Sequence, residues 1–306
     1  MSYRSIVLVK QVPDPKRVTG QAMTEEGTVN RAALPPIFNP EDLNALEAAL
    51  QVKDRHGGTV TVLTMGPPPA AQVLRDALYR GADAVALITD RRFAASDTLA
   101  TSYILTQAIR KVGEFDLVWC GRQAIDGDTA QVGPQTAEKL GIPQITYVEQ
   151  VLSLEDGVLT VRRGIEGGYE VLQCPLPVLL TVTDAANVPR PPNAKRLMQF
   201  KRAATATEVR NQVQREVQQA PEKQRDVDRL VAERLEILRA RNLLIPEWGA
   251  EEIGAAPERC GSAGSPTLVY RVEKVVLTSP GYREVLPTEE GLKGLFEELS
   301  RDHTLD

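Results

Sequence analysis

Histidine and cysteine are scarce in this chain of 306 residues, and each scarcity argues against a class of site. Only two histidines are present, His56 and His303, so a zinc cluster or a histidine-based catalytic triad is improbable. The three cysteines, Cys120, Cys174 and Cys260, are odd in number and far apart. That pattern argues against a disulfide framework and favours a reducing, cytoplasmic setting. Acid–base catalysis by the protein's own side chains is therefore poorly provided for.

Long apolar runs and an excess of positive charge are also lacking. No apolar segment is long enough to cross a bilayer, and no charged-then-apolar secretory leader follows Met1. The formal net charge is -5, whereas nucleic-acid-binding domains usually carry a basic face. We therefore expect neither an integral membrane protein nor a nucleic-acid partner. The chain is long enough for one large domain or for a domain with appendages.

The first half of the sequence alternates strands and helices. Apolar, β-branched runs predict strands over residues 5–10, 59–64, 84–89 and 116–120. Helices are predicted to begin after Asn39, near residue 70, near residues 96–97 and at Pro134. Asn39 is expected to cap its helix, with Pro40 at the first helical position. Repeated βα units of this length predict an α/β fold with a doubly wound, mostly parallel sheet that helices cover on both faces.

The period changes after residue 146. Strands over 151–154 and 159–163 flank the turn Glu155-Asp156-Gly157, which is typical of a β-hairpin. Further strands are predicted over 169–174 and 178–182, and we expect these strands to extend the sheet antiparallel or to form a small flap on it. The prolines of residues 189–192 predict an extended, exposed segment.

The segment 121–133, GRQAIDGDTAQVG, is the most informative stretch of the chain. A polar, glycine-containing turn between a strand and a helix is where open α/β sheets bind nucleotides, because unpaired N–H groups and the helix dipole attract phosphate there. Asp128 and Thr129 are good helix N-caps, and Asp126 or Gln123 could bond a ribose or an adenine edge. The alternative is an ordinary βα loop with aspartate caps, since no Walker lysine or GxGxxG accompanies it.

Five blocks in order resemble one family, the β subunit of electron transfer flavoproteins. They are VKQVPD at 9–14, NPED at 39–42, TMGP at 64–67, GAD at 81–83 and the segment 121–133. The resemblance covers residues 1 to about 203 and returns at 264–272. It implies a doubly wound α/β fold related to adenine-nucleotide hydrolases, and pairing with an α subunit that carries an FAD. In that family the β subunit holds either AMP or, in the electron-bifurcating group, a second FAD.

The resemblance also implies which residues form the cofactor pocket. All of them lie at carboxyl ends of predicted strands or at helix starts, which face one crevice. They are Leu8, Asn39, Pro40, Glu41, Asp42 and Met65, together with Gly121, Arg122, Gln123, Ala124, Ile125, Asp126, Gly127, Asp128, Thr129, Ala130, Gln131 and Val132. Met65 taken alone is more typical of a core residue than of a ligand contact.

Residues 96–102 bear on the choice between AMP and FAD. Ser96, Asp97, Thr98, Thr101 and Ser102 place hydroxyls and backbone donors at a helix start beside the same crevice, where a second phosphate could be received. The run DTLATS is similar to that of the bifurcating group. The alternative is a well-capped helix with exposed hydroxyls.

The resemblance implies electron transfer rather than bond-making by side chains. NADH would donate a hydride to the FAD of this subunit, and single electrons would then pass to a high-potential and a low-potential acceptor. The implied partners are the α subunit, a ferredoxin or flavodoxin, and a dehydrogenase or quinone oxidoreductase. The leucine that relatives use to dock dehydrogenases falls at Ala194, so an acyl-CoA dehydrogenase is not the expected partner.

The C-terminal third departs from the family pattern. The charged stretch 205–241 is short or absent in most relatives, and apolar residues of 226–241 recur at helical spacing. We expect a nucleotide-binding domain over 1–203 and a helical extension over 204–306 that packs on the α subunit or a partner. Two other classes remain open: a non-redox nucleotide-binding module with the same sheet, and an adenylating enzyme, which should carry a glycine-rich phosphate loop after the first strand.

Overall fold

The computed structural model describes residues 2–14, 35–219, 226–267 and 284–301. The chain divides into two compact units, 1–268 and 269–306. This division falls at residue 268, and the domain boundary that the sequence suggests at residue 203 stays a prediction. Among the described residues, no helix is both long enough and apolar enough to cross a membrane.

The strands of the larger unit are β1 (Tyr3–Val9), β2 (Gln11–Pro13), β3 (Pro36–Phe38), β4 (Gly58–Met65), β5 (Ala84–Ile88), β6 (Leu117–Gly121), β7 (Gln144–Glu155), β8 (Val158–Ile165), β9 (Gly168–Pro175), β10 (Val178–Val182), β11 (Ala204–Thr205), β12 (Leu244–Ile245) and β13 (Glu247–Trp248). Its helices are α1 (Pro40–His56), α2 (Ala71–Arg80), α3 (Thr98–Val112), α4 (Val132–Leu140), α5 (Ala194–Phe200), α6 (Ala206–Gln219) and α7 (Val227–Ala240). Short 3-10 turns are η3 (Pro68–Ala70), η4 (Arg91–Phe93), η5 (Asp184–Ala186), η6 (Pro257–Arg259) and η7 (Gly261–Gly264). The smaller unit contains α8 (Glu289–Arg301).

A nine-stranded sheet forms the centre of the described part of the larger unit, in the order β13-β5-β4-β1-β6-β10-β7-β8-β9. The strands from β13 to β7 run parallel, whereas β8 and β9 are antiparallel to their neighbours. The predicted hairpin is confirmed: Asp156 and Gly157 both have positive φ, 49° and 76°, as a tight two-residue turn between twisted strands requires. The later strands extend the sheet, and β8 and β9 are antiparallel as expected. The antiparallel expectation was wrong for β10 and β7, because β10 pairs parallel to β6 and β7 pairs parallel to β10.

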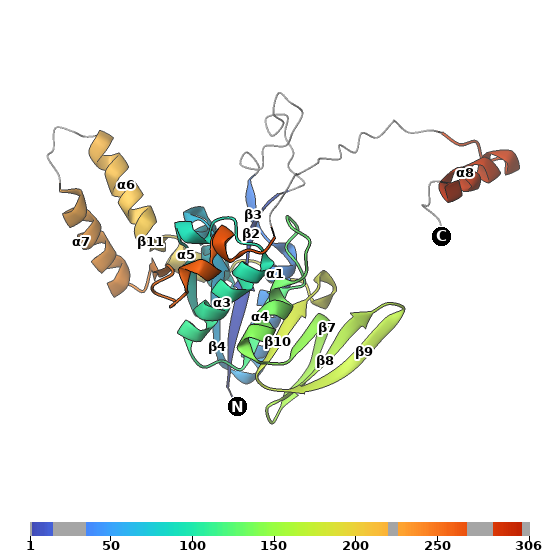
Figure 1. Ribbon diagram of the computed structural model, residues 1–306, viewed down its shortest axis with the longest axis horizontal. Helices are drawn as coiled ribbons and strands as arrows, with labels where there is room; N and C mark the ends of the chain where they lie inside the picture. The colour runs from blue at the N-terminus through green and yellow to red at the C-terminus, as the bar shows by residue number, and fades with distance from the viewer. Residues whose placement is uncertain (1, 15–34, 220–225, 268–283, 302–306) are drawn as a thin grey trace. The chain divides into compact units, whose positions relative to one another are not determined.

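Helices cover both faces of this sheet, as the sequence predicts. Alternate residues of β1 point to opposite sides, so Val7 packs in a core with α1 and α2, while Ile6 packs in a second core with α3 and α4. The two cores contain, respectively, Leu46 and Leu74, and Ile104 and Ala137. Figure 1 shows α3 and α4 side by side on one face. The fold is a doubly wound α/β sheet.

The charged stretch forms an antiparallel pair of helices, α6 and α7 (Figure 1). The apolar stripe of α7 packs against α6, where Val209, Val213 and Val231 form a small core separate from the two cores of the sheet. An ion pair between Arg75 of α2 and Glu208, with 2.9 Å between Nη1 and Oε2, ties the start of α6 to the main body. The hairpin therefore has its own packing and a local anchor.

We predict that Val213→Ala loosens this hairpin by about 1–3 kcal/mol without loosening the sheet, because the substitution leaves a cavity in a small, separate core. Amide hydrogen exchange should speed up over α6 and α7 while β1 and β6 keep their protection. Ile237→Ala is the matched control, since that side chain is 53% exposed and its loss should change little. Equal loss of protection in β1 would show that hairpin and sheet unfold as one unit.

Candidate functional site

The candidate site lies at the carboxyl ends of β1 and β6, which are neighbours in the sheet. The chain leaves β1 toward β4 on one side through α1, and it leaves β6 toward β7 on the other side through α4. Strand order reverses between β1 and β6, and at such a switch point the two connections separate and leave a crevice. The structure therefore places the start of α1 and the segment 121–131, both predicted from sequence, at this one point.

Asn39 joins these two segments. Its side-chain Nδ2 donates to the carbonyl of Gln123 at 2.9 Å, and its Oδ1 accepts from the N–H of Ile125 at 3.1 Å. Asn39 occupies the N-cap position of α1, but its side chain makes no capping hydrogen bond. The predicted N-cap position of Asn39 and the place of Pro40 at the first helical position are confirmed, but the side chain of Asn39 does not cap, because it bonds a backbone segment far along the chain.

Glu41 and Asp42 extend this junction, and both side chains are buried. Glu41 accepts from the N–H of Gln123 at 3.0 Å and pairs with Arg122 at 2.9 Å. Asp42 accepts from the N–H of Gly121 at 2.9 Å through one oxygen and from the N–H of Lys10 at 2.8 Å through the other. We call Asn39, Glu41 and Asp42 the α1 clamp.

The clamp leaves Asp42 in an unusual electrostatic position. Burial raises the pKa of its carboxyl to about 7, against the hydrogen bonds from Gly121 and Lys10 and the Lys10 charge, which lower it. Burial thus disfavours the negative form, and the N–H groups of Gly121 and Lys10 offset only part of that cost. Through these two bonds Asp42 links the ends of β1 and β6.

Two glycines allow the close approach that the clamp needs. A Cβ at Gly121 would lie 2.5 Å from Oδ1 of Asp42 and 2.7 Å from its backbone nitrogen. A Cβ at Gly133 would lie 2.8 Å from Sγ of Cys120 and 2.9 Å from a methyl group of Thr181. Glycine is therefore required at both positions, once for the clamp and once for the seating of α4 on the sheet.

The rest of the segment 122–131 is stabilised by a hydrogen bond between two of its own side chains and by an ion pair with Lys10. Nζ of Lys10 bonds both carboxylate oxygens of Asp126, at 2.7 and 2.9 Å, and the side-chain amide of Gln123 donates to Asp128 at 3.0 Å. Asp128 and Ala130 have φ of 49° and 51°, a region that non-glycine residues seldom enter. Such strained backbone is typical of ligand-binding loops.

The predicted capping of α4 by Asp128 or Thr129 was wrong. The N-cap position belongs to Gln131, and its side chain makes no capping bond. Asp128 and Ala130 have positive φ, so the backbone just before α4 departs from the extended conformation that an N-cap residue usually adopts. The first N–H groups of α4 therefore lack a side-chain acceptor within the described residues, and an anion at this helix start would find donors and the positive end of the dipole.

The start of α3 lies against the start of α4. Oγ1 of Thr98 donates to the side-chain oxygen of Gln131 at 3.0 Å and accepts from Gln135 at 3.3 Å. Ser102 is buried and bonds Gln135 and Lys139. The structure thus brings the predicted segment 96–102 beside the segment 121–131.

Asp97 caps α3 as expected, and residues far along the chain cover it. Oδ1 accepts from the N–H of Ala100 at 3.0 Å, while Oδ2 accepts from the hydroxyl and the N–H of Thr267 at 2.7 and 3.2 Å. Burial raises the pKa of Asp97, but these hydrogen bonds outweigh burial and hold the pKa below its usual value. Ser96 donates to the carbonyl of Phe93 and accepts from the N–H of Gly261. The start of α3 thus already carries a negative charge.

The remaining predicted residues have different surroundings. Leu8 is buried in the core beneath α3 and α4, so only its backbone lies at the crevice. Met65 is half-buried at the carboxyl end of β4 and packs on the same core. Pro40 is exposed.

Sequence reasoning missed two parts of the site. The first is Lys10, whose place at the end of the first strand was a usable signal. The second is the stacking of Arg122 over Tyr147, 5.7 Å from the ring centroid, with Nε of Arg122 buried and without a hydrogen-bond partner among the described residues. Nothing local in the sequence indicates this second contact, because it depends on how β7 is placed.

We predict that Asp42→Asn changes the pH dependence of stability. The pKa of Asp42 is raised in the folded state, so the folded protein binds the extra proton and wild-type stability falls as pH rises from about 4 to about 7. At about pH 4 the folded wild type carries a protonated, neutral carboxyl, so the neutral Asn variant should have about the same stability there. By about pH 8 the wild type has lost the stability that the raised pKa contributes, so the variant should then be the more stable of the two. Urea unfolding across this range measures the difference. Asp184→Asn, at an exposed position, is the control, and a pH-independent difference for Asp42→Asn would contradict the prediction.

Comparisons with known proteins agree with this geometry. The family model described as electron transfer flavoprotein domain matches residues 26–210, more than half of the chain. The electron transfer flavoprotein subunit beta of Thermoanaerobacterium thermosaccharolyticum is 52% identical over 190 residues, which cover 62% of this chain and 72% of that protein.

Longer matches extend past the charged stretch. Protein FixA of Azorhizobium caulinodans is 43% identical over 274 residues, covering 87% of this chain and 83% of that protein. The caffeyl-CoA reductase-Etf complex subunit CarD of Acetobacterium woodii is 42% identical over 269 residues, covering 88% and 86%. The fold, the site and these matches together show that the chain belongs to the electron transfer flavoprotein family, as a β subunit.

Proposed function

We propose that this chain holds an FAD at the carboxyl ends of β1 and β6 and works, with an FAD-containing α subunit, in NADH-dependent electron bifurcation. The observation that carries the proposal is the hydrogen bond between Thr98 and Gln131, which sets the starts of α3 and α4 side by side at the crevice. Two adjacent helix starts offer donors for two phosphates, as a dinucleotide requires. Bound FAD would supply hydride and single-electron chemistry, which the scarce histidines and engaged carboxylates of this chain do not.

The chain's own residues would bind and orient the cofactor. We propose that the backbone of 121–132 and the start of α4 receive the adenosine phosphate portion, beside Met65 and the backbone of Leu8. The α1 clamp and Lys10 would act as positioning residues, because their polar atoms bond the segment itself. The hydroxyls of Thr98 and Thr101 would face the second phosphate.

AMP is the second candidate, and one observation favours it. The carboxylate of Asp97 caps α3 and accepts two bonds from Thr267, so a second phosphate at this helix start would meet an existing negative charge. A single phosphate at α4 would avoid that repulsion. A non-redox nucleotide-binding module is the alternative from another class.

The proposed partners follow from the family and from relatives' names. We propose an α subunit as the obligatory partner, and a ferredoxin or flavodoxin and a dehydrogenase or quinone oxidoreductase as acceptors, in the cytoplasm. The name of CarD describes a complex with a caffeyl-CoA reductase, which supports a larger assembly with a dehydrogenase-type enzyme. Ala194 begins α5 at an exposed position, where relatives dock through a leucine.

We predict two FAD per heterodimer when this chain is produced with its α subunit. Chromatography of the nucleotides released by denaturation, measured against protein, separates the candidates. One FAD with one AMP would overturn the bifurcating proposal and support an AMP-holding subunit. Heterodimer without any flavin would point to the non-redox module.

We also predict that the double substitution Thr98→Val, Thr101→Val depletes the β-subunit FAD and leaves the α-subunit FAD in place. Each lost bond to a phosphate oxygen should weaken binding by about 1.5–3 kcal/mol, roughly 10- to 150-fold. Thr106→Val is the matched control, because the Thr106 hydroxyl bonds the carbonyl of Ser102 inside the same helix. Full occupancy of both flavins in the double variant would mean that these hydroxyls do not bind a phosphate and that Thr98 serves only to bond Gln131 and Gln135.

A further inference from the structure

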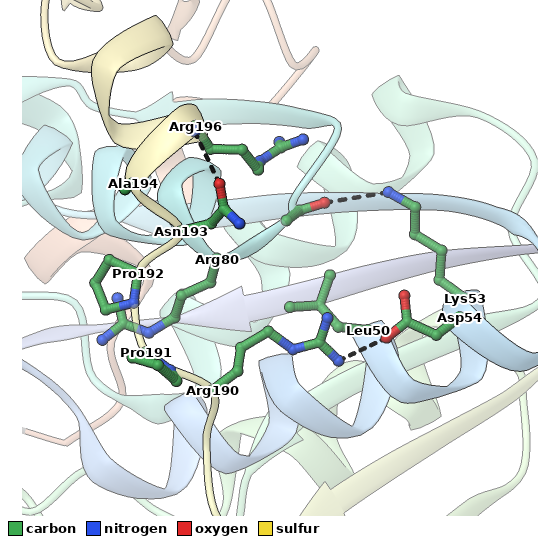
Figure 2. A pocket seen from close by; sticks show the side chains of 11 residues that line it. Leu50, Lys53, Asp54, Arg80, Arg190, Pro191, Pro192, Asn193, Ala194 and Arg196 are labelled. Atoms are coloured by element: carbon green, nitrogen blue, oxygen red, sulfur yellow. Dashed lines mark hydrogen bonds and ion pairs between the residues drawn. The ribbon is translucent and has the colours of Figure 1, made fainter.

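A pocket of about 600 Å³ includes residues of the carboxyl-terminal part of α1 (Figure 2). Helix α1 begins with Pro40 at the crevice and ends at His56, just before β4 starts. The pocket residues of α1, Leu50 to Asp54, lie ten to fourteen residues beyond Pro40. At about 1.5 Å per residue they are roughly 15–21 Å along the helix from the crevice. The pocket is therefore separate from the nucleotide site.

Three segments line this pocket: the last turns of α1, the end of α2 with Gly81, and residues 190–196. Figure 2 shows Arg190 directed toward Asp54, and Arg80 directed toward the proline segment. The charged side chains that line it are four cations and one carboxylate: Lys53, Arg80, Arg190, Arg196 and Asp54. The lining is therefore strongly positive before its partners are considered.

Two of the four cations are compensated. Arg190 pairs with Glu47 and with Asp54, each at 2.8 Å. Nζ of Lys53 pairs with Asp83 at 2.6 Å. These two side chains hold the walls of the pocket together, and their charge is already balanced.

The other two cations, Arg80 and Arg196, form no ion pair with a carboxylate of the described residues. Arg196 donates through Nε to the carbonyl of Leu78 at 2.6 Å and through a terminal nitrogen to that of Ala82. Arg80 donates through Nη1 to the carbonyl of Asp76 at 3.2 Å, while its Nε is buried and has no hydrogen-bond partner among the described residues. Buried donors without partners are rare, because each loses its hydration without replacement.

We propose that this pocket binds the phosphate group of a small phosphorylated molecule, with Arg80 as its cationic contact. The Arg196 guanidinium instead bonds two carbonyls and lies over the Phe200 ring, and Figure 2 shows its side chain directed away from the proline segment. Guanidinium groups match phosphate because their planar donors form paired, charge-assisted hydrogen bonds. The volume is in the range of small-molecule sites and exceeds what a lone phosphate needs. Pro191 and Pro192 restrict the backbone of one wall, so less freedom is lost on binding.

Burial supports the same assignment. It lowers the pKa of the Arg80 guanidinium, against the charges of Asp76 and Glu47, which raise it. A dianion in the pocket would restore the interactions that the buried cation has lost. The single lining carboxylate, Asp54, is 59% exposed and already pairs with Arg190, so it opposes an anion only weakly.

The test uses pyrophosphate as the probe and the heterodimer with its nucleotide site saturated by AMP or FAD. Calorimetry at low salt should show one saturable site that excess AMP does not displace. Arg80→Gln should weaken the binding at least about tenfold, because it removes charge-assisted bonds. Ala194→Glu, which places a carboxylate at an exposed lining position, should do the same without touching Arg80.

Arg55→Gln is the matched control, since Arg55 lies in the last turn of α1, is exposed and does not line the pocket. It should change the affinity less than about threefold, and nucleotide content should be unchanged in all variants. Absence of saturable binding, equal weakening by Arg55→Gln, or displacement by AMP would each overturn the proposal. Binding of an acidic protein segment in this pocket, without any binding of pyrophosphate, would also overturn the proposal.

Discussion

The contact of the α1 clamp with the segment 121–125 is the constraint on which the site depends. At the end of β6 and just after it, the N–H groups of Gly121, Gln123 and Ile125 and the carbonyl of Gln123 are bonded by side chains of the α1 clamp. Buried carboxylates and amides of this kind are stable only when their partners are present, since each unpaired group would cost about 1–3 kcal/mol. The clamp therefore specifies one conformation for the segment, and that conformation leaves the start of α4 open.

This use of carboxylates would allow an acidic chain to hold the anionic cofactor that we propose. Glu41 and Asp42 lie next to the proposed phosphate site, yet backbone N–H groups and Arg122 take their lone pairs. Lys10 likewise neutralises Asp126. The negative side chains of the NPED motif thus build the loop and do not repel the ligand, and what faces the crevice is mostly backbone.

Local sequence patterns predicted the helices and strands, but they did not predict the contacts between residues far apart in the chain. β-branched runs and glycine stops located β1, β4, β5, β6 and the helices between them, because these signals act within a few residues. The side-chain capping roles of Asn39 and Asp128 were wrong for one physical reason: a short polar side chain has several possible partners, and a distant segment or an αL backbone decides among them. The pairing of β13 with β5 rests on two residues, Glu247 and Trp248, too few to carry a strand pattern.

The first backbone N–H groups of α3 and α4 differ in their hydrogen-bond acceptors, and this difference bears on the choice of cofactor. Helix α4 lacks a side-chain cap, whereas α3 is capped by Asp97, whose carboxylate is itself held by Thr267. A second phosphate would therefore have to bind beside Asp97 through the hydroxyls of Thr98 and Thr101, or replace the hydrogen bonds that Thr267 donates to Asp97. Because Ser265 also bonds the N–H of Asp97 and the carbonyl of Gly261, the cover over Asp97 is a small folded unit rather than a single contact. The segment 261–267, distant in sequence from the strands that define the crevice, thus covers the start of α3, where the proposed second phosphate would bind.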